Sequence, residues 1–338
     1  LGGSEIGTFS DRMRDAVRGC CFNSEGSEIR RQQGIGNGLG VIPNELAADD
    51  AKSEYFTRLD HLRLGLVGNL ANFTLMNLSG EQVQGRDILY GNDPTAYALD
   101  PADTINYVSK HDNQTLWDNN QYRNAFELSR EERVRMHNQS LSFVLLAQGI
   151  PFIHMGSELL RSKSFLRDSY DYADWFNRVD FSMQDNFYHI GLPPAEKDQV
   201  NWPLIRNIIQ KNQGKDQVGS KEIKFSYGIF KEFLAIRAGM PHFRLSTSDQ
   251  ILEKVQFHNT GEKQQKGLIV MSITGENENV LVIFNFSNKS QFFSFKNSNN
   301  YHLHPVQITG IDKVVKQSFA SSHGFTVPGL TTAVFVTD

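Results

Sequence analysis

The sequence places a histidine, a carboxylate and an amide side by side, two residues after a short apolar run. The run is Ile105–Val108, and His111, Asp112 and Asn113 form the cluster. We expect the run to be a buried strand, and the carboxyl ends of parallel strands carry the chemistry of α/β barrels. The three side chains could hydrogen-bond sugar hydroxyls or stabilise a developing positive charge there, and Trp117 could stack on a sugar ring. Alternatively, the cluster is a turn that satisfies its own backbone.

Other catalytic motifs are not found. The glycine-rich stretch Gly34–Gly40 has Leu39 where a dinucleotide fingerprint needs its third glycine, and Pro43 interrupts any following helix. The sequence has no phosphate-binding loop and no His-Glu-x-x-His motif. His302 and His304 would share one face of a strand, but two histidines alone make no metal site.

Composition excludes several classes of protein. The 338 residues are 39% hydrophobic and 21% charged, as in an ordinary globular chain. The net charge of −4 gives no basic field for nucleic acid or an anionic membrane. The longest nearly apolar run, Leu141–Met155, is too short to span a bilayer. Two adjacent cysteines exclude a disulfide scaffold and a four-cysteine zinc site.

The elements around the cluster alternate between strand and helix. Residues 6–44 read as a strand, a turn and a long loop. Residues 48–73 predict a helix with one leucine-rich stripe and with Asp49 and Asp50 at its first turn. Ser129 begins a capping box, and the helix behind it extends to about residue 147. A second apolar strand follows at residues 150–155. This order predicts parallel strands with helical crossovers.

The second half of the chain has a different pattern. Residues 157–220 are expected to form a long loop-rich insertion, and residues 226–243 a helix. Beyond Arg244, short apolar runs alternate at period two between Gly, Asn and Ser turns, and no helix fits between them. We therefore predict an antiparallel β-sandwich over residues 247–338, after a first domain over residues 1–246.

The segment Tyr107–Asp118 (YVSKHDNQTLWD) resembles the fourth sequence region of the α-amylase superfamily (glycoside hydrolase family 13), in the form typical of pullulanases and limit dextrinases. Further segments resemble that family's sixth strand, the helix before its seventh strand, its eighth strand and the loop after it. In chain order these are Thr8–Gly19 (TFSDRMRDAVRG), Val67–Leu70 (VGNL), Gln148–Glu158 (QGIPFIHMGSE) and Asp174–Arg178 (DWFNR). The matches are collinear over about residues 6–245.

The resemblance implies a fold and an activity. The fold is the C-terminal part, about strands 6–8, of a (β/α)8 TIM barrel followed by an antiparallel β-sandwich. The activity is retaining hydrolysis of α-1,6 branch linkages in α-glucans, which needs two carboxylates about 5 Å apart. Asp112 matches the family's third carboxylate, the transition-state stabiliser, and His111 matches the histidine that binds the same sugar.

The resemblance also implies substrate contacts around this pair. Asn113 and Trp117 would shape nearby subsites, while Asp174, Trp175 and Arg178 would contact the non-reducing side of the glucan chain. A structural salt bridge between Asp174 and Arg178 is the alternative interpretation of the last group.

The sequence departs from the family in one respect. The nucleophile belongs to a Gly-x-Arg-x-Asp segment on the fourth strand and the acid/base Glu to the fifth strand, and neither segment occurs in these 338 residues. Asp15 and Glu158 are not substitutes, because they lie in the sixth-strand and eighth-strand matches. The chain begins Leu1-Gly2-Gly3 without Met, and we expect it to be part of a longer enzyme. Its partner would be the N-terminal half, and the chain alone would be inactive.

Two alternatives remain open. One is a non-catalytic α-glucan-binding or scaffold protein, and the other is a different specificity of the superfamily, such as isoamylase. No cofactor is required, although the acidic loop residues Asp168, Asp171 and Asp174 are compatible with a structural calcium ion. The expected partner is an α-glucan, with no nucleic acid and no membrane, and the sequence gives no localisation.

Overall fold

The computed structural model describes residues 2–4, 6–20, 23–47 and 51–337 of the chain. Its first part contains a three-stranded parallel sheet in the order β1-β6-β7. These strands are β1 (Thr8–Phe9), β6 (Thr104–Asn106) and β7 (Ile150–Pro151). Thr8 pairs with Thr104, and Ile105 pairs with Ile150. The two predicted strands are therefore present and parallel, but shorter than predicted. The described residues contain no closed barrel.

Helices connect these strands and recur along the rest of the chain. Their bounds are α1 (Asp11–Arg18), α2 (Ser27–Arg31), α3 (Ala51–Leu66), α4 (Leu116–Arg123), α5 (Arg130–Leu145), α6 (Asp174–Asn177), α7 (Ala195–Asp198), α8 (Trp202–Asn212), α9 (Ser220–Gly239), α10 (Ser248–Lys254) and α11 (Pro305–Thr309). The predicted capping box of α5 is confirmed, because the Glu132 carboxylate accepts from the Ser129 N–H at 2.8 Å and the Ser129 hydroxyl accepts from the Glu132 N–H at 3.3 Å.

Two predictions in the first half need correction. Helix α1 occupies part of the stretch predicted as turn and loop after the first strand. The predicted helix over residues 48–73 ends at Leu66, because Gly68 and Asn69 have φ angles of 73° and 52°, which a right-handed helix cannot contain. Asp49 and Asp50 lie outside the described residues.

The C-terminal part contains two antiparallel sheets. The larger has the order β12-β15-β10-β9-β8 and the smaller the order β11-β14-β13. Their strands are β8 (Val255–Phe257), β9 (Leu268–Ile273), β10 (Val280–Asn285), β11 (Gln291–Ser294), β12 (Tyr301–Leu303), β13 (Phe319–Ser321), β14 (Gly324–Val327) and β15 (Thr331–Thr337). Two short hairpins lie in the first half, β2 (Thr74–Met76) with β3 (Gln82–Gln84) and β4 (Leu89–Tyr90) with β5 (Asp93–Pro94).

The five-stranded sheet is buried on both faces. In β10, Val282 and Phe284 belong to a core shared with α3, α5 and α9, whereas Leu281 and Ile283 pack toward the three-stranded sheet. The predicted period-two alternation is therefore wrong for β10, in which every residue is buried, and it holds for β11, which has one solvent-facing side. The prediction that no helix lies among these strands is also wrong, since α11 stands between β12 and β13.

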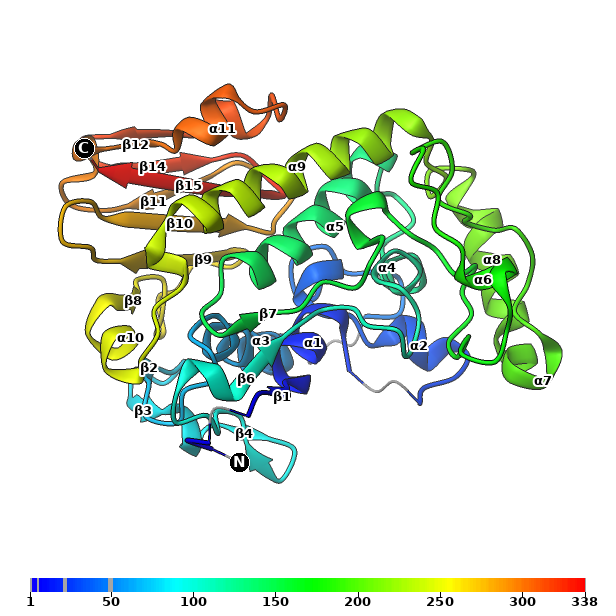
Figure 1. Ribbon diagram of the computed structural model, residues 1–338, viewed down its shortest axis with the longest axis horizontal. Coiled ribbons are helices and arrows are strands. Elements are labelled where there is room, and N and C mark those ends of the chain that lie inside the picture. Colours follow the sequence, from blue (N-terminus) through cyan, green and yellow to red (C-terminus); the bar gives the residue numbers. More distant parts are fainter. Residues whose placement is uncertain (1, 5, 21–22, 48–50, 338) are drawn as a thin grey trace.

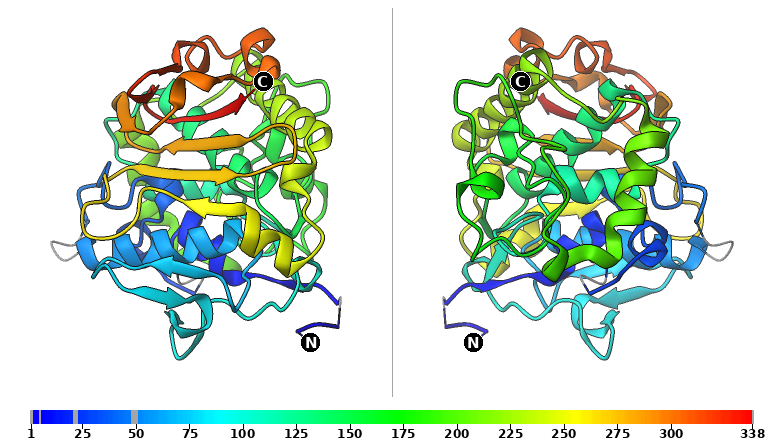
Figure 2. Two further views of the ribbon diagram at one scale, coloured as in Figure 1. Left: turned by 90° about the vertical axis from the view of Figure 1, so that its left-hand side faces the viewer. Right: turned by 90° about the vertical axis from the view of Figure 1, so that its right-hand side faces the viewer.

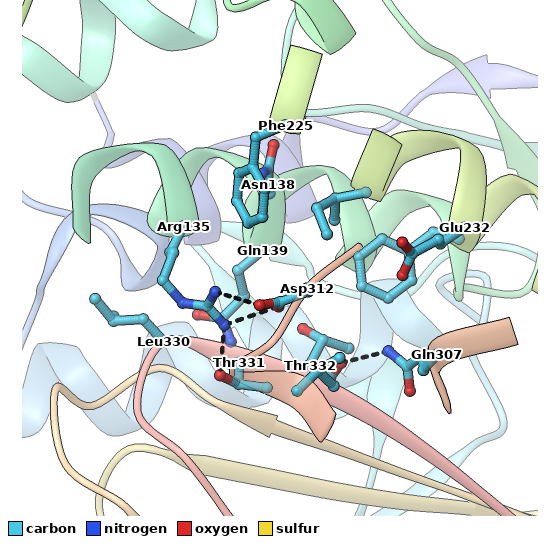
Figure 3. Close-up of a pocket in the computed structure, with 13 residues that line it drawn as sticks. Arg135, Asn138, Gln139, Phe225, Glu232, Gln307, Asp312, Leu330, Thr331 and Thr332 are labelled. Carbon is cyan, nitrogen blue, oxygen red and sulfur yellow. Dashed lines mark hydrogen bonds and ion pairs between the residues drawn. The ribbon is translucent and has the colours of Figure 1, made fainter. Parts of the chain in front are cut away.

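Figure 1 shows the C-terminal strands at one end of the molecule and α6, α7 and α8 at the other, with α9 running between them. Figure 2 shows the same two ends face on. A buried ion pair joins α5 to the C-terminal part: Arg135 donates to both oxygens of Asp312, at 2.9 and 3.1 Å, and to the Thr331 hydroxyl at 2.7 Å (Figure 3).

Candidate functional site

The predicted cluster lies in the loop that leaves β6. Tyr107 and Val108 continue the strand direction as buried residues, and the chain then emerges, so that 77% of the His111 side chain and 48% of the Asp112 side chain are exposed. Asn113 has a φ of 65°, a left-handed conformation that asparagine tolerates better than most residues. The loop therefore presents an imidazole and a carboxylate to solvent.

The Asp112 carboxylate contacts a lysine and a histidine side chain. The Lys110 ammonium lies 2.5 Å from Asp112 Oδ2, and His111 Nε2 lies 3.3 Å from Asp112 Oδ1. The hydrogen bond from Lys110 lowers the pKa of Asp112 below its ordinary value. The carboxylate is therefore ionised at neutral pH and can accept hydrogen bonds or stabilise positive charge.

Two buried cations fix the backbone of this loop. Arg18 donates to the carbonyl oxygen of Val108 at 3.0 Å and to that of Gln114 at 2.7 Å, so it holds both ends of the loop. Lys163 Nζ donates to the carbonyl oxygen of His111 at 3.0 Å and to that of Arg167 at 3.1 Å. Burial lowers the pKa of Lys163 to about 8.

Sequence reasoning missed both positioning residues. Arg18 lies in a segment matched to the family and Lys163 in a stretch predicted as loop, but neither residue stands near the cluster in sequence. Only the folded structure shows that these two side chains contact the backbone of the loop.

A chain of hydrogen bonds connects this loop to α6. Arg161 donates to His154 Nε2 at 3.3 Å and to the Asn177 carbonyl oxygen at 2.6 Å. Because arginine can only donate, His154 Nε2 accepts, and its Nδ1–H faces the Ser109 hydroxyl at 3.3 Å. Burial, assisted by the Arg161 charge, lowers the pKa of His154 to about 3, so this link stays neutral above that pH.

The second group of predicted contacts lies on and beside α6. Asp174 and Trp175 are exposed, with 55% of Trp175 accessible. The Arg178 guanidinium lies 4.9 Å from the centre of the Trp175 ring and 4.0 Å from that of Phe187. Over the part of the chain that the structure describes, no ion pair joins Asp174 to Arg178. The aromatic contacts therefore orient the arginine.

Trp117 requires a correction. Its side chain is fully buried in α4, with its ring centre 5.9 Å from that of His137. A buried ring cannot stack on a sugar, so the prediction that Trp117 contacts the substrate is contradicted. Its closeness to the cluster in sequence suggested a substrate contact, but the sequence does not show which face of α4 carries the ring.

The described side chains offer no ready metal site. Among the described residues, no group of three or more His, Cys, Asp or Glu side chains could hold a metal ion. The structural calcium ion stays a prediction. None of the described helices is long and apolar enough to cross a bilayer.

Comparison with known proteins places this arrangement in a family context. A family model described as "Alpha-1,6-glucosidases, pullulanase-type, C-terminal" matches residues 183–338. The pullulanase of Klebsiella aerogenes is 47% identical over 277 residues, which cover 81% of this chain and 24% of that protein. The chloroplastic pullulanase 1 of Arabidopsis thaliana is 41% identical, over 99% of this chain and 36% of that protein.

Solved structures agree with the sequence matches. The crystal structure of PulA from Klebsiella oxytoca superposes with a TM-score of 0.95 at 39% identity, covering 100% of this chain and 33% of that one. The Klebsiella pneumoniae pullulanase complexed with maltotriose gives a TM-score of 0.94 at 40% identity, covering 99% and 33%. This chain spans about a quarter to a third of these relatives. The resemblance predicted from the sequence is thus confirmed, and the chain corresponds to the C-terminal portion of the pullulanase-type α-1,6-glucosidases.

Proposed function

We propose that this chain is part of a retaining glycoside hydrolase that cleaves α-1,6 branch linkages in α-glucans such as pullulan, limit dextrins, starch or glycogen. Asp112 is its transition-state stabiliser. The observation that carries the proposal is the position of Asp112, an exposed and ionised carboxylate at the end of a parallel strand, within a chain similar to pullulanases over its length.

In this proposal β1, β6 and β7 are strands 6–8 of a (β/α)8 barrel. Their parallel order and the intervening helices support that assignment. The nucleophile, the acid/base and strands 1–5 come from an N-terminal half of the same enzyme.

The side chains have separate roles. The ionised Asp112 accepts hydrogen bonds from sugar hydroxyls and stabilises the oxocarbenium-like charge, and His111 donates to the same sugar. Asn113 contacts an adjoining subsite. Asp174 and Arg178 bind the glucan on its non-reducing side, with Trp175 as an exposed stacking surface. Two carboxylates and a water molecule suffice for the hydrolysis, so no cofactor is required.

The experiment compares the 338-residue chain, the N-terminal half of a pullulanase and the two together, with release of reducing sugar from pullulan as the readout. We expect turnover only when both parts are present. Asp112→Asn should then lower kcat by a factor of about 100 or more, because a charge-stabilising contact is lost in the transition state.

Asp93→Asn, at an exposed carboxylate on the β4–β5 hairpin, is the matched control and should leave kcat unchanged. Turnover of pullulan by the chain alone would contradict the proposal. So would glucan binding without turnover in the combined protein, which is the behaviour of a binding or scaffold protein.

A further inference from the structure

Two exposed phenylalanine rings stand in one row on the three-stranded C-terminal sheet. Phe292 on β11 is 47% exposed and Phe319 on β13 is 54% exposed. Each is paired across the sheet with Thr326 on the central strand β14. The two phenylalanines are therefore two strand spacings apart, about 10 Å.

Both rings point away from the molecule. Their sequence neighbours Phe293 and Ala320 pack with Phe325 into the core between the two sheets. Because side chains alternate along a strand, Phe292, Thr326 and Phe319 face solvent. The Phe292 ring lies over Gly324, where a Cβ atom would stand 2.9 Å from Phe292 Cζ. The tip of this ring therefore lies close to a position without a side chain, while 47% of the residue stays exposed.

The adjacent row is small and uncharged. It consists of Ser294, Gly324 and Ser321, which are register partners. We define the Phe292–Phe319 face as these two rows, with members Phe292, Ser294, Phe319, Ser321, Gly324 and Thr326. None of the six carries a charge, and three carry hydroxyl groups.

We propose that the Phe292–Phe319 face is a second α-glucan-binding surface, separate from the Asp112 site. The proposal rests on the function proposed above, which makes the substrate a long neutral polymer. A glucan matches the face in charge, since both are neutral. It also matches in chemistry, because sugar rings have apolar C–H faces that stack on aromatic rings and hydroxyl edges that pair with Ser and Thr.

The size of the face argues against a protein occupant. A phenylalanine buries about 150–250 Å² at most, so two half-exposed rings offer about 200 Å² together. A stable dimer or protein complex buries about 800 Å² on each partner. A second copy of this chain would need a much wider apolar surface than these two rings.

The test uses the combined protein in the Asp112→Asn background, so that hydrolysis of the glucan is slowed about 100-fold or more while binding is measured. Retardation in native gels that contain soluble amylopectin measures the affinity. The double variant Phe292→Ala/Phe319→Ala should weaken binding about five- to tenfold, and Phe292→Tyr/Phe319→Tyr should restore it, because the rings are kept. Ile308→Ala, at a 48% exposed residue on α11, is the matched control and should bind normally.

Further measurements separate the outcomes. With Asp112 intact, the double variant should hydrolyse a short branched oligosaccharide at the parent rate. The single variant Phe319→Ala keeps Phe292 in its place beside Gly324. It therefore tests the proposal if the double variant does not fold. Amylopectin binding by the double variant within twofold of the parent would overturn the proposal. A parent that is dimeric and a double variant that is monomeric would overturn it too. If the combined protein does not hydrolyse pullulan but its glucan binding still requires the two phenylalanines, the second binding surface is supported and the proposed hydrolase function is contradicted.

Discussion

At the scale of single residues, the candidate site depends on cations that bind the backbone. Lys163 illustrates this, because its ammonium group holds the His111 carbonyl oxygen from beneath the loop. Lys163→Met removes both hydrogen bonds and leaves two carbonyl oxygens unsatisfied, which destabilises the fold by about 2 kcal/mol. Because Lys163 positions the loop, Lys163→Met should lower kcat about tenfold or more, measured at temperatures where the variant is fully folded.

The measurements are kcat and KM on pullulan together with thermal unfolding, in the combined protein. Lys221→Met, at an exposed lysine of α9, serves as the control. A Lys163→Met variant with a lowered Tm but an unchanged kcat would show that Lys163 supports folding only.

His137 predicts how stability depends on pH. Its Nε2 lies 2.7 Å from the Ser157 carbonyl oxygen, and burial lowers its pKa from 6.5 to about 4. The unfolded chain therefore takes up a proton below pH 6.5 while the folded protein does not. The stabilisation is complete above pH 6.5 and is lost as the pH falls through 4.

Between pH 7 and pH 4.5 this effect lowers the free energy of unfolding by about 2 kcal/mol. Urea denaturation at several pH values measures it, and His137→Gln should show a flatter pH profile than the parent. His323→Gln, at an exposed histidine, should keep the parent profile. Equal slopes for the parent and His137→Gln would contradict this assignment.

How far the site could be predicted differs from residue to residue. His111 and Asp112 were recognisable because they follow an apolar strand within a family motif. Trp117 was misplaced, because its burial depends on the packing of α4 against α5. Arg18 and Lys163 act on carbonyl groups 90 and 52 residues away in sequence, and no local pattern encodes such contacts.

At the scale of elements, the end of α1 depends on a glycine. Gly19 has a φ of 89°, and a Cβ atom there would stand 2.0 Å from the Gln32 carbonyl oxygen. Gly19→Ala therefore combines left-handed strain with a backbone clash and should destabilise the protein by about 3 kcal/mol. Gly80→Ala is the matched control: its φ is 80° with nothing within 4 Å, so about 1 kcal/mol is expected. Chemical denaturation of both variants measures the difference, and equal losses would exclude the clash.

Helices and strands could be predicted well where a short sequence pattern alone determines them. The capping box fixed the start of α5, and alternation was correct for β11. Alternation failed for β10, because a strand covered on both faces is apolar throughout and only the tertiary neighbours reveal that. The helix predicted over residues 48–73 extended too far, since Leu70 and Phe73 are core residues contributed by a loop.

At the scale of the whole molecule, Arg135 and Asp312 join the helical part to the C-terminal sheets (Figure 3). Both side chains are more than 90% buried. Arg135→Met leaves the Asp312 carboxylate buried without its partner and should lower the free energy of unfolding by about 3–5 kcal/mol. The double variant Arg135→Met/Asp312→Leu should recover most of this loss.

The exposed pair Arg31 and Glu28 provides the comparison, and Arg31→Met should lower stability by less than about 1 kcal/mol. Urea unfolding of the parent, Arg135→Met, Asp312→Leu and the double variant completes the cycle, and Arg31→Met is measured beside them. A double variant as unstable as Arg135→Met alone would mean that the arginine contributes by packing.

The burial of β10 on both faces has one more consequence. Val282 and Phe284 belong to the same core as Leu59 of α3 and Ile236 of α9. Although the sequence changes character near residue 246, the C-terminal strands do not form a detachable module. Removing them would expose a large apolar surface on the remaining helices. Heating the intact chain should therefore unfold both regions in a single endotherm.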